Sequence, residues 1–426
     1  MIRAVLFWTH LTTGVVTGAI ILIMSVTGVL LTYEKQMLRW ADTRQLSAIN
    51  APLSMRLGVD SLIMLAAAAK AGKTATSFVM RADPATPAQV SFGQAGLVYL
   101  HPATGAVLGT GSDAARGFFR SMTNWHRWLA GEGPNRDRGR AFTGASNLAF
   151  LLLVLTGMVL WLPKTLTWIR VRSVLWFRAA LSAKAREFNW HNVLGIWSAL
   201  PLIAIVVSGS VISYPWASDL VYKVVGETPP PRTPPGPPAG EAAGRRAGGA
   251  GGTVDADRRT RGTSGATVAV TDSSLPGVSA APAPQFAAMI GSSLALMPDW
   301  KSVTLQVPKP DAKTASITLD RGTGAQPQYR ATVTISTATG AITRYQPFDS
   351  LTSGRKVRNV LRFAHTGEVF GLTGQTIAGL VSLASVVLVY TGIALALRRA
   401  ARALSRRRAD AVATRVQESA VTEPLR

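Results

Sequence analysis

Two stretches decide the fold of this chain: WTHLTTGVVTGAIILIMSVTG at residues 8–28 and WHNVLGIWSALPLIAIVVSGS at residues 190–210. Both are uncharged and apolar over about 20 residues, the length of helix that crosses a bilayer. In each stretch a histidine, His10 or His191, precedes a glycine by 18 positions. The shared spacing indicates an internal duplication.

The composition is that of a membrane protein with unevenly charged loops. The 426 residues are 47% hydrophobic and include 45 Lys and Arg against 22 Asp and Glu, which gives a formal charge of +23. Apolar and basic character together favour a membrane protein over a nucleic-acid binder. The absence of cysteine excludes disulfides, thiolate-ligated iron-sulfur clusters and c-type haem attachment, so any haem here would be held by His or Met.

Four uncharged apolar runs predict an integral α-helical membrane protein with four transmembrane helices. The runs are 11–33, 141–162, 192–214 and 373–397. We expect the first run to remain as an anchor, because it is too long for a signal peptide and no small-x-small cleavage site follows it.

Lys and Arg cluster between the second and third runs and after the fourth run. Because these residues concentrate in cytoplasmic loops, we expect both termini to be cytoplasmic and the two long connections to face the other side. The basic surplus also suits contact with anionic membrane lipid.

The two long connections carry matching hairpins, LVYLHPATGAVLG at 97–109 and TVTISTATGAITR at 332–344. Each reads as two alternating strands around a turn and follows a helical stretch and another strand pair. We therefore expect one α+β outer domain in each repeat. The second repeat is longer by 58 residues, the length of the Pro/Gly/Ala-rich stretch 228–285, whose composition predicts a disordered insertion.

Four of the five histidines lie at span ends, in two pairs that the duplication relates. His10 and His191 lie near the cytoplasmic starts of spans, and His126 and His365 lie on the outer approaches to spans. A pseudo-twofold axis along the membrane normal would bring each pair face to face at its own depth. Two facing imidazoles at each level are what two bis-histidine b-type haems require. His101 has no counterpart and is predicted to be a surface turn residue.

Small residues follow the inner histidines at i+4 and i+8: Gly14 and Gly18 in one repeat, Gly195 and Ala199 in the other. They either leave room for a porphyrin or let helices pack closely while the histidines bond across helices. A bare zinc or copper site is disfavoured, because the pairs are far apart and the spans contain no Asp, Glu or Cys.

Four arginines flank the outer histidines: Arg120, Arg127, Arg358 and Arg362. Guanidinium groups suit carboxylates such as haem propionates. The same groups suit lipid headgroups or an anionic substrate equally well.

These motifs together resemble those of the PepSY-associated transmembrane family. The resemblance is carried by His10, NWHRWL at 124–129, WHNVLG at 190–195, RFAHTGEVFG at 362–371 and the two Ala-Thr-Gly-Ala hairpins. It covers nearly the whole chain except 228–285 and the Arg-rich tail. The resemblance implies a bacterial inner-membrane protein with two PepSY-like periplasmic domains. It would make His10, His126, His191 and His365 the axial ligands of haem iron.

The predicted segments follow from the spans, the repeat and the resemblance. They are a first transmembrane helix (1–40), a first periplasmic PepSY-like domain (41–118), an approach helix with the second transmembrane helix (119–163), a basic cytoplasmic loop (164–189), the third transmembrane helix (190–216), a second PepSY-like domain (217–227 and 286–355), the insertion (228–285), an approach helix with the fourth transmembrane helix (356–398) and a basic cytoplasmic tail (399–426).

Some members of the family are di-haem reductases of ferric siderophores, so the resemblance implies a ferric-siderophore reductase. Electrons from the cytoplasmic or membrane side would pass through two b-type haems to ferric siderophore iron in the periplasm. No G-x-G-x-x-G motif follows a predicted strand, so we expect an external electron donor, a quinol or a separate reductase. The alternative is a membrane-anchored PepSY protein that inhibits a protease or senses a ligand without redox activity. A transporter is disfavoured, because no acidic or basic side chain interrupts the spans.

Overall fold

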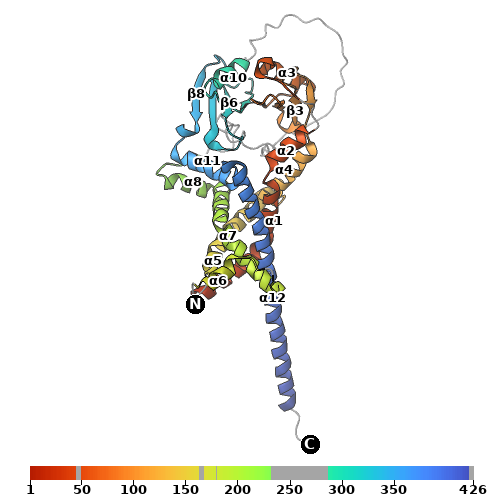
Figure 1. The fold of residues 1–426 in the computed structure, drawn as a ribbon, viewed down its shortest axis with the longest axis vertical. Helices are drawn as coiled ribbons and strands as arrows, with labels where there is room; N and C mark the ends of the chain where they lie inside the picture. The colour runs from red at the N-terminus through yellow and green to blue at the C-terminus, as the bar shows by residue number, and fades with distance from the viewer. Residues whose placement is uncertain (45–48, 163–166, 179, 232–285, 422–426) are drawn as a thin grey trace. The chain divides into compact units, whose positions relative to one another are not determined.

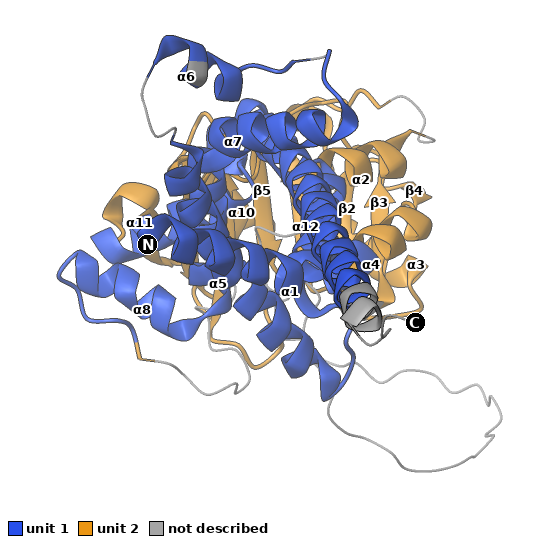
Figure 2. Ribbon diagram, turned by 90° about the horizontal axis from the view of Figure 1, so that it is seen from below, with its two compact units in different colours: residues 1–34, 121–230, 352–426 blue, residues 35–120, 231–351 orange. Residues whose placement is uncertain are grey.

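The computed structural model describes residues 1–44, 49–162, 167–178, 180–231 and 286–421 (Figure 1). The chain divides into two compact units, each assembled from separate segments (Figure 2). The helical unit comprises Met1–Glu34, Ser121–Pro230 and Thr352–Arg426, and the sheet unit comprises Lys35–Arg120 and Pro231–Leu351. The predicted insertion lies, from residue 232 to residue 285, outside the described residues.

Four long helices form the helical unit. They are α1 (Ile2–Leu31), α5 (Asn135–Trp161), α7 (Ala183–Ser213) and α12 (Gly371–Val421). Over the described ranges these are the four helices long and apolar enough to cross a membrane, which confirms that the four predicted runs form long apolar helices. The first three have 27 to 31 residues and so reach at least about 40 Å. At 51 residues, α12 continues from its apolar part into the Arg-rich tail.

The long helices pack as a ring in which neighbours run antiparallel. Both α1 and α7 pack against α5 and α12, so α1 and α7 lie at opposite corners. The direction of packing is clear between α1 and α12: Gly18 faces Ile393, whereas the carbonyl of Thr32 accepts a hydrogen bond from Gln375 at 3.1 Å.

Basic residues gather at one end of this bundle. Arg3 donates to the carbonyl oxygens of Leu160 and Leu162 at the end of α5, at 3.0 and 2.7 Å. At the same end Arg398 of α12 makes a two-pronged ion pair with Glu187 near the start of α7, at 2.9 and 2.8 Å. The N-terminus, the connection between α5 and α7 and the start of the basic tail therefore lie together.

Shorter helices complete both units. They are α2 (Glu34–Thr43), α3 (Val59–Ala69), α4 (Asp113–Trp128), α6 (Trp168–Leu175), α8 (Pro215–Val224), α10 (Phe286–Leu294) and α11 (Ser353–His365), with single 3₁₀ turns at Leu53–Met55, Gly93–Ala95, Pro327–Tyr329, Phe348–Ser350 and Glu368–Phe370. Two of them, α4 and α11, carry the outer histidines. The predicted second outer domain starts at residue 217, but α8 belongs to the helical unit.

The sheet unit holds one antiparallel sheet of eight strands in the order β4-β3-β2-β1-β5-β6-β7-β8. The strands are β1 (Ser77–Arg81), β2 (Ala88–Ser91), β3 (Leu97–Leu100), β4 (Val107–Gly109), β5 (Ser302–Gln306), β6 (Thr314–Asp320), β7 (Arg330–Ser336) and β8 (Ile342–Pro347). The two Ala-Thr-Gly-Ala segments form the turns of the hairpins β3–β4 and β7–β8, as predicted.

The sequence predicts two outer domains, whereas the structure joins both α+β parts in a single sheet. The join is the antiparallel pair of β1 with β5, which is centred on Val79 opposite Thr304 and extends to Ser77 opposite Gln306. Each strand would otherwise be a sheet edge with unpaired backbone groups, and pairing the two edges satisfies those groups.

One face of the sheet carries a hydrophobic core shared by both parts. Helices α3 and α10 cover this face. Phe78 of β1 and Leu305 of β5 lie opposite each other and are fully buried. Strand β7 alternates buried and half-buried positions, as a strand with one buried face should.

A helix cap also ties the two parts together. The carboxylate of Asp60, in the first turn of α3, accepts hydrogen bonds from the N–H groups of Phe286 and Ala287, both at 2.9 Å. These are among the first N–H groups of α10, which have no partner within their own helix. The sheet unit therefore folds as one layered α+β body.

Candidate paired-histidine site

Four histidines meet as two facing pairs within the helical unit. The ring centroids of His10 and His191 lie 6.3 Å apart with an interplanar angle of 84°. Those of His126 and His365 also lie 6.3 Å apart, at 60°. The inner pair comes from opposite corners of the ring, α1 and α7, and the outer pair comes from α4 and α11. These are the pairs that the repeat predicts.

Each inner imidazole contacts a threonine of a neighbouring helix. His10 Nδ1 lies 2.9 Å from Thr156 Oγ1 in α5, and His191 Nδ1 lies 3.0 Å from Thr391 Oγ1 in α12. The residue after each threonine is a glycine, where a Cβ would come within 3.3 Å of the imidazole Cε1. We call each such hydroxyl-glycine pair a histidine seat.

The outer imidazoles use seats on α1 and α7. His126 Nδ1 lies 3.0 Å from Thr27 Oγ1. His365 Nδ1 lies 3.4 Å from Ser208 Oγ and 2.8 Å from the carbonyl oxygen of Ile205. Again a glycine follows each hydroxyl residue, and a Cβ there would lie 3.6 and 3.1 Å from the two Cε1 atoms.

The seats determine which imidazole nitrogen carries the proton. The hydroxyls of Thr27, Thr156 and Thr391 each donate at 2.7 Å to the carbonyl four residues earlier in their own helix. A hydroxyl has one hydrogen, so each oxygen is left to accept from the imidazole Nδ1–H. His365 is fixed in the same way, because the carbonyl of Ile205 can only accept. All four rings thus keep Nε2 as the nitrogen with a free lone pair.

The seats have a sequence signal that histidine spacing does not reveal. Each long helix carries a Thr-Gly or Ser-Gly dipeptide where an imidazole arrives: 27–28, 156–157, 208–209 and 391–392. Serine and threonine in a helix bond back to a carbonyl of the preceding turn, which leaves their oxygen as an acceptor. The glycine removes the side chain that would keep the ring away.

Burial keeps the outer imidazoles neutral. Burial, the facing imidazole of His365 and the guanidinium of Arg127 lower the pKa of His126 to about 4. Burial also lowers the pKa of His365, and Arg127 acts in the same direction. A neutral imidazole with a free Nε2 is the form that binds a metal ion.

The distance between the two ring centres of each pair fits a metal ion held between two imidazoles, with its other ligands supplied by a group other than the protein. Two metal–imidazole bonds of about 2.0 Å, with about 1 Å from each nitrogen to its ring centre, would separate the ring centres by about 6 Å. Within the described ranges no three His, Asp or Glu side chains are grouped as ion ligands. Each pair therefore offers two imidazole ligands, and it would suit an iron ion that takes its other ligands from a porphyrin.

The four flanking arginines take different positions. Arg120 is exposed in the part of α4 that belongs to the sheet unit. Arg127 and Arg362 each lie over the aromatic ring of the following residue, with Cζ 4.4 and 5.9 Å from the ring centroids. Arg358 Nε donates to Ser218 Oγ at 2.8 Å. Contact with haem propionates stays a prediction for all four.

The small residues beside the inner histidines serve helix packing. A Cβ at Gly18 would lie 3.3 Å from the side chain of Ile393, and one at Gly195 would lie 3.8 Å from Leu388. Both neighbours belong to α12. Close packing of helices describes these two contacts, and room for a porphyrin beside the inner histidines stays a prediction.

The chain turns sharply after each outer histidine. Leu129 and Ala130 have φ of 51° and 57°, and Gly367 and Gly371 have φ of 73° and 64°. This left-handed region costs energy for residues other than glycine. Ala130 and the two glycines therefore turn the chain toward the next long helix.

The fifth histidine lies apart from the pairs, in the sheet unit. His101 follows β3, and its Nδ1 accepts hydrogen bonds from the N–H groups of Ala103 and Thr104, both at 3.3 Å. It is a turn residue, as predicted.

Fold and site together define a helical membrane protein with four candidate spans, two half-buried histidine pairs and an eight-stranded α+β part. The family described as PepSY-associated TM region matches residues 7–399, and the chain belongs to this family. The matched range includes all four paired histidines. No curated protein matches the chain.

Proposed function

We propose that this protein is a di-haem, b-type electron-transfer protein of the bacterial inner membrane that reduces ferric siderophore iron in the periplasm. Its electrons would come from the cytoplasmic or membrane side, from a quinol or a separate reductase. The observation that carries the proposal is the pair of facing imidazole couples, each with a ring separation of 6.3 Å and with Nδ1 already used as a donor.

The residues of the chain would act as ligands and as supports for those ligands. His10 and His191 would hold one haem through Nε2, and His126 and His365 the other. When bound, the haems supply one-electron transfer at iron. The seats hold each ring in one tautomer and one orientation, and a hydrogen bond from the second nitrogen makes an imidazole a stronger ligand.

The two sites would serve opposite ends of the bundle. His10 and Thr27, the seat residue for His126, lie 17 positions apart in α1, which corresponds to about 25 Å along a helix. We propose that the end carrying Arg3 and Arg398 faces the cytoplasm and that the sheet unit is periplasmic. The gathering of basic residues at that end supports this orientation.

We infer that the chain is an internal duplication. His191 and Ser208 in α7 repeat the 17-residue spacing of His10 and Thr27 in α1. The order of the first four strands, outward from β1, is matched by that of the last four, outward from β5. Both features are expected of two copies related by a twofold axis.

The visible spectrum of detergent-purified protein from haem-replete cells tests haem binding. We expect a reduced b-type band and about two haems per chain. His10→Ala and His126→Ala should each lose about one haem, and the matched control His101→Ala should lose none. A colourless protein would overturn the proposal in favour of the membrane-anchored regulatory or binding protein.

A second measurement tests the reaction. Anaerobically reduced protein, mixed with ferrioxamine and a chelator that colours with ferrous iron, should be reoxidised with one ferrous ion formed per electron. Haem-loaded protein that stays reduced would refute the siderophore assignment and leave haem binding intact.

A further inference from the structure

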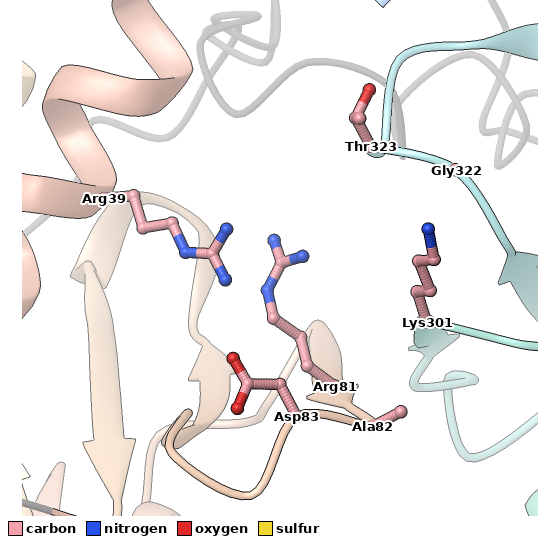
Figure 3. Close-up of a pocket in the computed structure, with 7 residues that line it drawn as sticks. All are labelled: Arg39, Arg81, Ala82, Asp83, Lys301, Gly322 and Thr323. Carbon is pink, nitrogen blue, oxygen red and sulfur yellow. The ribbon is translucent and has the colours of Figure 1, made fainter.

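A pocket lies in the sheet unit, at one end of the ladder between β1 and β5. Its volume is about 300 Å³, and Figure 3 shows the residues that line it. The lining comes from Arg39 of α2, residues 81–83 at the end of β1, Lys301 before β5 and residues 322–323 after β6. This size is at the lower end for small-molecule sites. The pocket exists only because the two parts of the sheet are joined.

Positive charge dominates the lining. Arg39, Arg81 and Lys301 are set against one carboxylate, Asp83, which leaves a net charge of two positive. The guanidinium groups of Arg39 and Arg81 reach into the same space from different elements (Figure 3). The carboxylate is partly committed, because Asp83 Oδ1 accepts the N–H of Ala85 at 2.9 Å.

The three cations of the pocket make no direct polar contact with the described residues. Across the part of the chain that the structure describes, the side chains of Arg39, Arg81 and Lys301 have no hydrogen bond or ion pair. Burial, and next the like charge of Arg39, lower the pKa of Arg81, and the carboxylates of Asp320 and Asp83 oppose this only in part. The nearby carboxylate of Asp320 is already held by Arg330, with Nε 3.3 Å from Oδ2. Partly desolvating a guanidinium without a partner is unfavourable, and a bound anion would remove that cost.

The opposite end of the β1–β5 ladder forms the same backbone structure without positively charged side chains, so pairing of these strands does not require the charges of Arg81 and Lys301. The ladder is centred on one residue pair, so its two ends are equivalent, and the backbone hydrogen bonds that close them are alike at 3.0 and 3.1 Å. At the pocket end, Arg81 ends β1 and Lys301 precedes β5. At the other end, Gln306 ends β5 and Thr76 precedes β1. The same backbone is therefore formed with neutral side chains.

We infer that this pocket binds a small molecule bearing an oxyanion, a carboxylate or a phosphate, with the guanidinium of Arg81 as its main contact. The planar guanidinium fork suits both groups. Arg39 and Lys301 would neutralise the remaining charge of the ligand. The inference is independent of haem binding and of the proposed reductase activity.

Calorimetric titration of the full-length protein in neutral detergent, at low ionic strength, tests the inference with citrate and with inorganic phosphate as separate probes. We expect one saturable site for at least one of them, and the tighter probe identifies the chemistry. Because a hydrogen bond to a charged group is lost, Arg81→Gln should weaken binding about 10- to 100-fold. Lys301→Gln, at an exposed position, should weaken it in the same direction without risk to folding.

The matched control is Arg344→Gln, which removes an exposed arginine from the edge strand β8. Binding should stay within a factor of about two of the unsubstituted protein, since only the general field changes. Three results would overturn the inference: no saturable binding of either probe, binding unchanged in both pocket variants, or an equal loss in the control.

Discussion

The imidazole of His191 donates its Nδ1–H to Oγ1 of Thr391 at 3.0 Å, and the hydroxyl of Thr391 in turn donates to a carbonyl of its own helix at 2.7 Å. The threonine therefore transmits the orientation of the α12 backbone to an imidazole on α7. Because the side chain is 2% exposed, water does not compete for this contact. The orientation of the free Nε2 is thus set by the sequences of the spans.

Thr391→Val should weaken the inner haem site. Valine keeps the volume of threonine but removes the acceptor for His191. Loss of such a supporting contact lowers metal affinity by about 10- to 100-fold. Transfer of haem to an excess of apomyoglobin should therefore be faster for about half of the bound haem. The control Thr17→Val removes a hydroxyl that bonds the carbonyl of Thr13 in its own helix. Equal transfer rates in the two variants would contradict the role of the seat.

Gly209→Ala should empty the outer site. A Cβ at this position would lie 3.1 Å from Cε1 of His365 and 3.2 Å from Oδ1 of Asn147, so the imidazole has to move. We expect the haem content to fall from about two to about one per chain, because overpacking of this kind costs about 1–3 kcal/mol. The haem-to-protein ratio measures the loss.

The control for this prediction is Gly195→Ala in the same helix. There the added Cβ makes an ordinary contact, 3.8 Å from Leu388. Alanine is favoured over glycine in a helix by about 1 kcal/mol, so this variant should keep both haems and be at least as stable to heat. Two haems in both variants would show that the glycine of the seat is dispensable.

The spans and the histidine pairs could be predicted from the sequence for a physical reason. An uncharged apolar run of about 20 residues has one stable form in lipid, the helix, because every backbone group must be paired internally. The equal offset of His10 and His191 from their glycines then relates the two halves. The seats were harder to predict, because the face that Thr156 presents to another helix depends on packing and not on its own helix.

The joining of the two α+β parts in one sheet could not be predicted in the same way. Alternation places Phe78 and Leu305 on the buried face of their strands, and the structure agrees. However, the alternation of apolar and polar residues along a strand predicts only which sheet face each side chain lies on. It does not predict which strands are neighbours in the sheet. The pairing of β1 with β5 depends on bringing together segments more than 200 residues apart, and so does the cationic pocket at its end.

Leu305→Ala tests whether the sheet unit is one cooperative body. The side chain is fully buried opposite Phe78, so the substitution should destabilise the unit by about 2–5 kcal/mol. Hydrogen exchange should then quicken in β1 and β2 as well as in β5 to β8. The control Thr304→Ala alters a half-buried neighbour and should leave the exchange of β1 nearly unchanged. Faster exchange confined to β5 to β8 would mean that the two parts unfold separately.

A buried tyrosine should make the sheet unit sensitive to alkali. The hydroxyl of Tyr99 donates to Oδ2 of Asp42 at 2.9 Å, and Oδ1 of Asp42 also accepts from the N–H of Ser112 at 2.6 Å. Arg116 completes the cluster with an ion pair to Asp42 at 2.8 Å. Burial, and then the charge of Asp42, raise the pKa of Tyr99. The folded protein thus keeps a proton that the unfolded chain releases near pH 10.

The difference in bound protons between the folded and unfolded chain determines how the contribution of Tyr99 to stability changes with pH. The stabilising contribution of Tyr99 is complete below pH 10 and is lost as the pH rises above it, by about 1.4 kcal/mol per pH unit. Tyr99→Phe removes the titration and one donor to Asp42, so at pH 7 it should cost about 1.5–3 kcal/mol. The difference in the free energy of unfolding between the unsubstituted protein and Tyr99→Phe should therefore become smaller above pH 10. Urea unfolding of the full chain, followed by the circular dichroism of its strands, measures this difference. The control is Tyr329→Phe at an exposed position, whose free energy of unfolding should change with pH in the same way as that of the unsubstituted protein. If the free energy of unfolding of Tyr99→Phe also changed with pH in that way, the Tyr99 proton would not be linked to folding.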